Sequence, residues 1–136
     1  MRELTATLAG GSQDQIVLDM EAGVEHLSRG TVRNTDILLV VAEPYYKALE
    51  TAARVAALGR ELGIARVLTI VNKVRPSDEE SIRQFATRHG LAIAAEIPYD
   101  ESVAEADRRG IAPIDHDASC AMIHSVEALS RLLLNG

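Results

Sequence analysis

The chain has 136 residues, 47% hydrophobic and 3% aromatic, which suits one domain with a core of aliphatic side chains. Its 14 basic and 20 acidic residues give a net charge of −6, which argues against nonspecific nucleic-acid binding because that binding rests on Lys and Arg at phosphates. The single cysteine, Cys120, excludes an intrachain disulfide, and no apolar stretch reaches the roughly 20 residues of a membrane span, so we expect a cytoplasmic protein.

Four short apolar runs predict β-strands. They cover residues 15–19 (QIVLD), 36–43 (DILLVVAE), 65–72 (ARVLTIVN) and 91–98 (LAIAAEIP). The second and third runs are almost continuously apolar and β-branched. This composition is typical of parallel strands that are covered by helices on both faces.

Helical patterns separate the last three runs. Apolar residues from Ala48 to Leu62 recur at the i, i+3, i+4 spacing of one helix face, and Gly63 is placed to end that helix in a left-handed turn. Ser77 and Glu80 predict a capping box at the start of the next helix, which Gly90 closes.

Two aspartates predict the starts of the remaining helices. Asp100 should cap a short helix through about Arg109, and Asp117 should cap the last helix. The apolar face expected of that last helix is Ala121, Met122, Val126, Leu129 and Leu133, with Cys120 buried beside it. Residues 2–9 are the candidate for an opening helix.

Alternating strands and helices imply parallel strands joined by right-handed crossovers. We therefore expect a single α/β domain over residues 1–136, with an open, mainly parallel sheet of about four strands flanked by helices in three layers. Ligands of such sheets bind beyond the carboxyl ends of the strands. A site is accordingly sought at residues 19–26, 43–44, 72–73 and 98–100.

The sequence contains no phosphate-binding loop of the P-loop type. That loop needs the pattern G-x-x-x-x-G-K-[ST], whose lysine neutralises the phosphates. The only lysines are Lys47 and Lys73, which follow Tyr46 and Asn72, so no Gly-Lys pair exists. We therefore expect no standard triphosphate grip from this chain alone.

Asp19 ends the first apolar run, and Gly23 follows four residues later. In one interpretation Asp19 holds a water of a bound Mg²⁺ and Gly23 lets the chain turn close to a γ-phosphate, as in nucleotide switches. In the other, Asp19 caps a short helix, and the spacing leaves both open. The nearby Glu21, Glu25 and His26 are interpreted as a solvated acidic loop, because zinc prefers more nitrogen or sulfur ligands.

Two further strand ends carry candidate base-binding residues. Asn72 can offer a donor and an acceptor to a purine edge, while the stem of Lys73 packs along the ring. Pro98 can form one wall of a base pocket next to Tyr99. The alternatives are a strand-end turn capped by the asparagine, and an Asp100 that only caps the following helix.

Four segments together resemble a known family. They are DMEAGVEHLSRGT (19–31), TDILLVVAEP (35–44), VLTIVNKVR (67–75) and IPYDESVAEADRRG (97–110). They resemble the C-terminal half of the MinD/ParA-type P-loop ATPases, in particular the CooC-type accessory ATPases that assist nickel insertion into carbon monoxide dehydrogenase. The resemblance runs over nearly the whole chain from about Gln15.

The resemblance implies roles for the candidate residues. Asp19 corresponds to the Walker B-type aspartate near Mg²⁺, and Gly23 to the switch II glycine. Asn72 corresponds to the asparagine that reads adenine, and Lys73 lies beside it. Pro98 and Tyr99 correspond to the loop that borders the base. Mg-ATP is the implied ligand, and a carbon monoxide dehydrogenase-type metalloenzyme is the implied partner.

The matched region lacks several elements of that family. Its P-loop, switch I and nickel-binding C-x-C pair all precede the segments matched here. The resemblance therefore implies a truncated, partial P-loop NTPase fold that holds half a nucleotide site, does not hydrolyse ATP alone and has no nickel site. The strand that carries the P-loop lies between two of the matched strands, so we expect the chain to re-pair its strands or to form a homo-oligomer. The alternative is a non-enzymatic binding module that pairs with a partner protein or a full-length paralogue.

Overall fold

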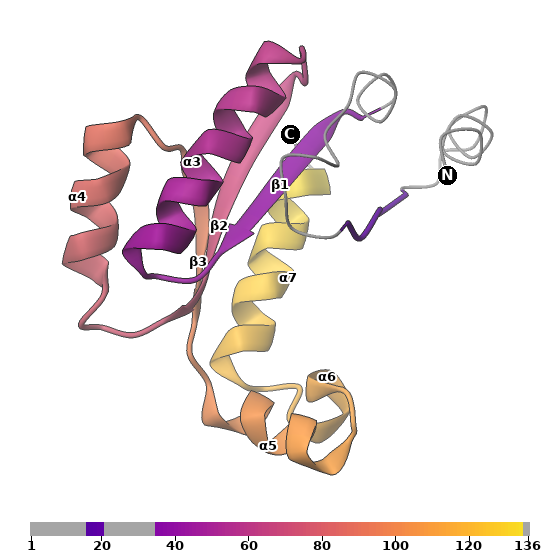
Figure 1. The fold of residues 1–136 in the computed structure, drawn as a ribbon. Helices are drawn as coiled ribbons and strands as arrows, with labels where there is room; N and C mark the ends of the chain where they lie inside the picture. The colour runs from indigo at the N-terminus through magenta and orange to yellow at the C-terminus, as the bar shows by residue number, and fades with distance from the viewer. Residues whose placement is uncertain (1–15, 21–34, 135–136) are drawn as a thin grey trace.

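The computed structural model describes residues 16–20 and 35–134 (Figure 1). Strands and helices alternate along the described chain. In order, they are β1 (Ile37–Ala42), α3 (Tyr46–Glu61), β2 (Arg66–Val74), α4 (Glu79–His89), β3 (Ile93–Pro98), α5 (Glu101–Arg109), α6 (Pro113–His116) and α7 (Ala121–Leu134).

The described strands form one open sheet in the order β1-β2-β3, with both pairings parallel. The β1–β2 register runs from Ile37 opposite Arg66 to Ala42 opposite Val71. Helices α3 and α4 lie on one side of the sheet and α7 on the other (Figure 1). The predicted class, an open parallel α/β sheet flanked by helices, is confirmed.

The strand predicted over residues 15–19 is wrong for the part that is described. Residues 16–20 have no regular secondary structure and are not part of the sheet, so the described sheet has three strands. Val17 is 90% exposed. A strand is stable only when its backbone groups pair with a neighbour, and β2 is the only described strand that β1 pairs with.

The main core lies between the sheet and the two helices α3 and α4. It is aliphatic, as the composition predicts, apart from Phe85; its most buried members are Leu49, Ala52, Ala56, Val71 and Ile82. Phe85 of α4 also meets the ring of Tyr46 of α3 edge-on at 5.6 Å, a favourable aromatic geometry that joins the two helices.

The two faces of β1 differ in burial. Val40 and Ala42 are buried in the core, whereas the alternate residues Leu39 and Val41 are 38% and 63% exposed. Since successive side chains of a strand point to opposite faces, β1 presents one apolar face to solvent. This is the face on which α7 lies, but α7 packs mainly against β3.

Glycines end two helices as predicted, but the capping box at α4 is wrong. Gly63 (φ +89°) follows α3 and Gly90 (φ +61°) caps α4. Helix α4 begins at Glu79, after Asp78, whose carboxylate instead accepts the backbone N–H of Arg75 at 2.9 Å. This bond closes the turn before the helix, which leaves Ser77 outside it; the carboxylate of Glu80 pairs with Arg83 at 2.8 Å.

Asp100 connects the first turns of two helices. Its Oδ1 accepts the backbone N–H and the hydroxyl of Ser102 in α5, as predicted for an N-cap, and its Oδ2 accepts the backbone N–H of Met122 in α7 at 3.4 Å. The hydroxyl and backbone N–H of Ser102 hold the pKa of Asp100 below its ordinary value, because both bonds favour the charged carboxylate. One side chain therefore ties the end of β3 to both α5 and α7.

The predicted role of Asp117 needs correction, and the predicted face of α7 is only partly buried, at Met122, Leu129 and Leu133. Asp117 accepts the backbone N–H and hydroxyl of Ser119 in the turn before α7, while Asp100 reaches the helix itself. Cys120 is buried as predicted, but no residue of α7 is, and Val126 is 44% exposed. The reason is that α7 packs against the edge strand β3 rather than over the middle of the sheet. The opening helix predicted over residues 2–9 lies outside the described residues.

We expect Asp100→Ala to lower the free energy of unfolding at pH 7 by about 1–2 kcal/mol, the usual cost of removing a helix cap. Because the folded pKa of Asp100 is lowered, its stabilisation is present above its ordinary pKa of 3.8 and is lost as the pH falls below that value. Urea unfolding should therefore show the difference between wild type and variant shrinking in acid.

Asp107→Ala, the same change on the exposed side of α5, serves as the control and should cost little. An Asp100→Ala variant no less stable than the Asp107→Ala variant would contradict the double cap.

Candidate functional site

The carboxyl ends of the three described strands meet at one edge of the sheet. Val74, the last residue of β2, is paired with Pro98, the last residue of β3, and the backbone N–H of Tyr99 donates to the carbonyl of Val74 at 2.8 Å. The four residues of the predicted base site therefore lie at the ends of two neighbouring strands. We call the group formed by Glu43, Asn72, Lys73, Arg75 and Tyr99 the edge cluster.

The β2 strand is irregular where it joins this cluster. The β2–β3 register shifts between Val71 and Val74, so the pairing is interrupted at Asn72 and Lys73. Lys73 has φ +59°, the single positive φ of a non-glycine residue in the described chain. This left-handed conformation costs free energy for residues other than Gly, Asn and Asp, so neighbouring contacts must hold it.

Two contacts hold Lys73 at this irregularity. Its backbone N–H donates to Oδ1 of Asn72 at 3.0 Å. Its ammonium Nζ lies 2.8 Å from Oε1 of Glu43, the residue that follows β1. The hydrogen bond to Glu43, and then the charge of that carboxylate, raise the pKa of Lys73 above its ordinary value. The lysine therefore bridges two strand ends, and the packing of its stem along a bound base stays a prediction.

The ring of Tyr99 is held from two further directions. The guanidinium carbon of Arg75 lies 4.0 Å from the ring centroid, in cation–π geometry, and the phenol donates to Oε2 of Glu101 at 2.8 Å. The ring is fixed in place, yet Tyr99 remains 39% exposed. An aromatic residue oriented in this way is suited to stack against a flat ligand.

Arg75 is not among the residues predicted from the sequence, and Glu43 was predicted only as a strand end at which a site could lie. The signal for both was the strand register. Val74 opposite Pro98 makes Arg75 and Tyr99 neighbours, and Ala42 opposite Val71 brings the residues after β1 beside those at the end of β2. Opposite charges, or a cation and an aromatic ring, at such neighbouring positions predict a contact once the strands are aligned.

The predicted phosphate and magnesium residues are not part of this group. Asp19 is exposed within residues 16–20, outside the sheet that carries the edge cluster. Gly23 lies outside the described residues. Within residues 16–20 and 35–134, no three His, Cys, Asp or Glu side chains are grouped so as to hold a metal ion. No helix in that same part of the chain is long and apolar enough to cross a membrane.

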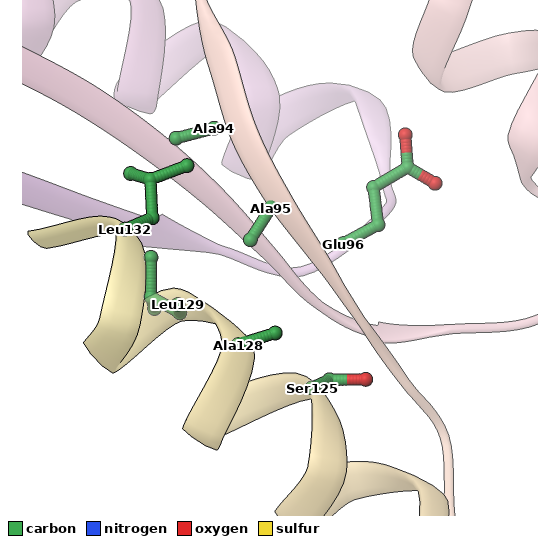
Figure 2. Close-up of a pocket in the computed structure, with 7 residues that line it drawn as sticks. All are labelled: Ala94, Ala95, Glu96, Ser125, Ala128, Leu129 and Leu132. Carbon is green, nitrogen blue, oxygen red and sulfur yellow. The ribbon is translucent and has the colours of Figure 1, made fainter. Parts of the chain in front are cut away.

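A hollow separate from the edge cluster lies between β3 and α7 (Figure 2). It has a volume of about 250 Å³ and is lined by Ala94, Ala95, Glu96, Ser125, Ala128, Leu129 and Leu132. The lining is mostly apolar, and the carboxylate of Glu96 points away from α7 in Figure 2. None of the predicted site residues lines it, so the edge cluster remains the candidate site.

Comparison with known proteins finds relatives that are named as ATP-binding proteins. No family model matches the sequence. It is 38% identical over 122 residues to an uncharacterized ATP-binding protein of Methanocaldococcus jannaschii, covering 89% of this chain and 47% of that protein. It is 35% identical over 121 residues to the carbon monoxide dehydrogenase accessory protein CooC of Rhodospirillum rubrum, covering 88% of this chain and 45% of CooC.

The fold agrees with these sequence relatives. The MinD cell division protein of Aquifex aeolicus superposes with a TM-score of 0.68 at 20% identity, covering 84% of this chain and 50% of MinD. The chain thus spans about half the length of each of these three proteins. The predicted resemblance to part of the MinD/ParA-type proteins, near CooC, is confirmed.

We expect Glu43→Gln to return the pKa of Lys73 toward its ordinary value of 10.5, because both leading causes of its increase come from the Glu43 carboxylate. Titration of the lysine Nζ and Cε resonances by NMR measures this pKa directly. Glu80→Gln, which breaks the ion pair between Glu80 and Arg83 on α4, should leave the Lys73 titration unchanged. A Lys73 pKa that is the same in wild type and Glu43→Gln would show that the ion pair is absent in solution.

Proposed function

From the homology of this chain to part of the MinD/ParA-type ATP-binding proteins, we propose that it supplies the base-binding half of a nucleotide site. The observation that carries the proposal is the position of Asn72 and Tyr99 at the ends of the neighbouring parallel strands β2 and β3. Ligands of open parallel sheets bind at this edge. Adenine is the base that the relatives' ATP would bring there.

Each residue of the edge has a chemical part in the proposal. The side-chain amide of Asn72 offers an adenine edge one acceptor and one donor. The exposed ring of Tyr99, backed by Arg75, stacks on the base, and Pro98 forms the neighbouring rigid wall. Lys73 positions the asparagine, because its backbone N–H donates to the Asn72 amide oxygen and its ammonium is bound to Glu43.

Phosphate binding and hydrolysis are not assigned to the chain alone. The sequence has no P-loop motif, and the one carboxylate of the edge cluster, Glu43, is paired with Lys73. The described edge therefore does not fit a magnesium site, and no step of the proposal passes through the metal. Asp19 and Gly23 keep their Walker B-like and switch II-like roles only as implied by the resemblance.

The biological setting is proposed from the similarity to CooC. That relative is named as an accessory protein of carbon monoxide dehydrogenase. We propose that this chain belongs to an ATP-binding protein that serves nickel maturation of such a metalloenzyme, with the enzyme as its partner. Binding of the purified chain to a carbon monoxide dehydrogenase, measured by calorimetry, would test the partner separately from the nucleotide.

The nucleotide proposal predicts that adenosine and ATP shift the backbone amide resonances of residues 72–75 and 99 in a ¹⁵N-labelled sample. We expect weak binding, with a Kd of about 1 mM, equivalent to about −4 kcal/mol, because the sequence has no P-loop motif to bind the phosphates. Asn72→Ala should abolish the shifts by removing the amide that reads the base. NMR titration suits this affinity range.

Gln84→Ala, an amide removed from the exposed side of α4, is the matched control and should bind adenosine like wild type. Shifts confined to other parts of the chain would contradict the proposed site. Low-micromolar binding of Mg-ATP by the chain alone would contradict the proposal that it holds only half a site.

Self-association is proposed for the same chain. The outer edge of β1 has no partner strand among the described residues, and Leu39 and Val41 are exposed beside it. Such an edge is a template for pairing with another chain. We propose a homo-oligomer formed along β1.

We expect Val41→Lys to shift the chain from the proposed homo-oligomer to the monomer, since a charged side chain on an edge strand opposes pairing and burial. Light scattering coupled to size-exclusion chromatography measures the mass. Val126→Lys, the same change at an exposed position of α7, should leave the mass unchanged. A wild-type chain that stays monomeric at the highest concentration it tolerates would contradict the proposal.

A further inference from the structure

The side-chain amide of Asn72 is held in one orientation by its neighbour. A backbone N–H can only donate, so the atom that faces the N–H of Lys73, 3.0 Å away, must be the amide oxygen Oδ1. The nitrogen Nδ2 then lies on the other branch of the amide. A rotation of the amide by 180° would set two donors against each other and lose this bond.

The left-handed backbone of Lys73 accompanies this bond. Lys73 has φ +59° at the point where the β2–β3 register is interrupted. The conformation orients the peptide plane whose N–H meets Asn72. It is an unfavourable conformation for lysine, and it is the one that a β-branched residue adopts with most difficulty.

The ion pair with Glu43 supports that backbone from the neighbouring strand. Nζ of Lys73 and Oε1 of Glu43 are 2.8 Å apart, although 30 residues separate the two in sequence. Both side chains are about half exposed, at 55% and 42%, so the pair alone contributes little to stability. Its geometric effect is to hold the lysine across the ends of β1 and β2.

We propose that Glu43 and Lys73 form a lock that fixes the Asn72 amide in the orientation suited to an amino-purine, so that this pair sets base selectivity without contacting the base. The proposal rests on the proposed function, in which Asn72 contacts the base. Glu43 and Lys73 are positioning residues in it.

The chemistry of the two purines explains the selectivity. Adenine presents an amino donor beside the N7 acceptor, which a fixed amide matches with its second oxygen lone pair and its Nδ2 donor. Guanine presents the O6 and N7 acceptors, for which the amide oxygen is the wrong partner. An amide that is free to rotate presents the matching donor and acceptor to adenine only part of the time, so releasing the lock should weaken adenosine binding and narrow its preference over guanosine.

Two substitutions at one position separate the backbone from the ion pair. Lys73→Gly removes the ion pair but accepts the left-handed conformation without strain, whereas Lys73→Val removes the ion pair and opposes that conformation. The Kd of adenosine and guanosine is measured by NMR titration for wild type, both variants, Glu43→Gln and the control Glu80→Gln. The same spectra report that each variant is folded.

We expect wild type and Glu80→Gln to prefer adenosine. Lys73→Val should reduce the preference by about tenfold, the effect of losing one good hydrogen bond. Glu43→Gln and Lys73→Gly should each reduce it by about two- to fivefold, the range of an exposed ion pair. A preference in Glu43→Gln equal to that in Glu80→Gln would overturn the part of Glu43 in the lock. Hydrogen exchange tests the lock without a ligand. The backbone N–H of residue 73 should be protected from exchange in wild type and should exchange rapidly in Lys73→Val.

These measurements distinguish failure of the proposed function from failure of the lock. A wild-type chain in which adenosine shifts no resonance of the edge cluster overturns the proposed function and, with it, the role of the lock in selectivity. Adenosine binding at the edge with equal preference in wild type and Lys73→Val overturns the lock while leaving the proposed function in place. An unprotected Lys73 amide in wild type also overturns the lock, whatever the nucleosides do.

Discussion

The parallel pairing of β2 with a strand on each side is the constraint on which the candidate site depends. Parallel strands end at the same edge of a sheet, so three distant parts of the sequence arrive together there. The interrupted pairing at Asn72 and Lys73 is possible because it comes at the end of β2, after the ladder with β1 has closed at Val71. The regular pairing thus makes the sheet a rigid support, and the irregular end of β2 carries the polar groups.

The connection after β3 extends this edge to the rest of the chain. Tyr99 is joined to β2 through the carbonyl of Val74, and the next residue, Asp100, binds the first turns of α5 and α7. A carboxylate suits both positions because helix N-termini carry free N–H groups and partial positive charge. Two consecutive residues therefore fix the proposed base-binding ring relative to both the sheet and the helices that follow it.

The sequence predicted features that depend on local chemistry better than those that depend on the register between strands. The strands β1 to β3, the helix ends at Gly63 and Gly90, and the cap at Asp100 follow from composition and short-range rules. The capping box failed because Asp78 made a competing bond to the N–H of Arg75, a choice that short-range rules do not decide. Arg75 over Tyr99 and Lys73 beside Glu43 required the register between strands, which no single segment encodes. The run at 15–19 has the composition of a strand, but pairing depends on a neighbour that composition does not supply.

The left-handed lysine also bears on how this site can diverge in evolution. At φ +59°, glycine and asparagine fit position 73 without distorting the end of β2, whereas valine or isoleucine would need the loop to be rebuilt. The backbone conformation therefore limits which residues position 73 accepts, independently of any requirement of function. A homologue with a β-branched residue there, or without an acidic residue after the first of these strands, should have reorganised its strand end and with it the face that it offers to a ligand.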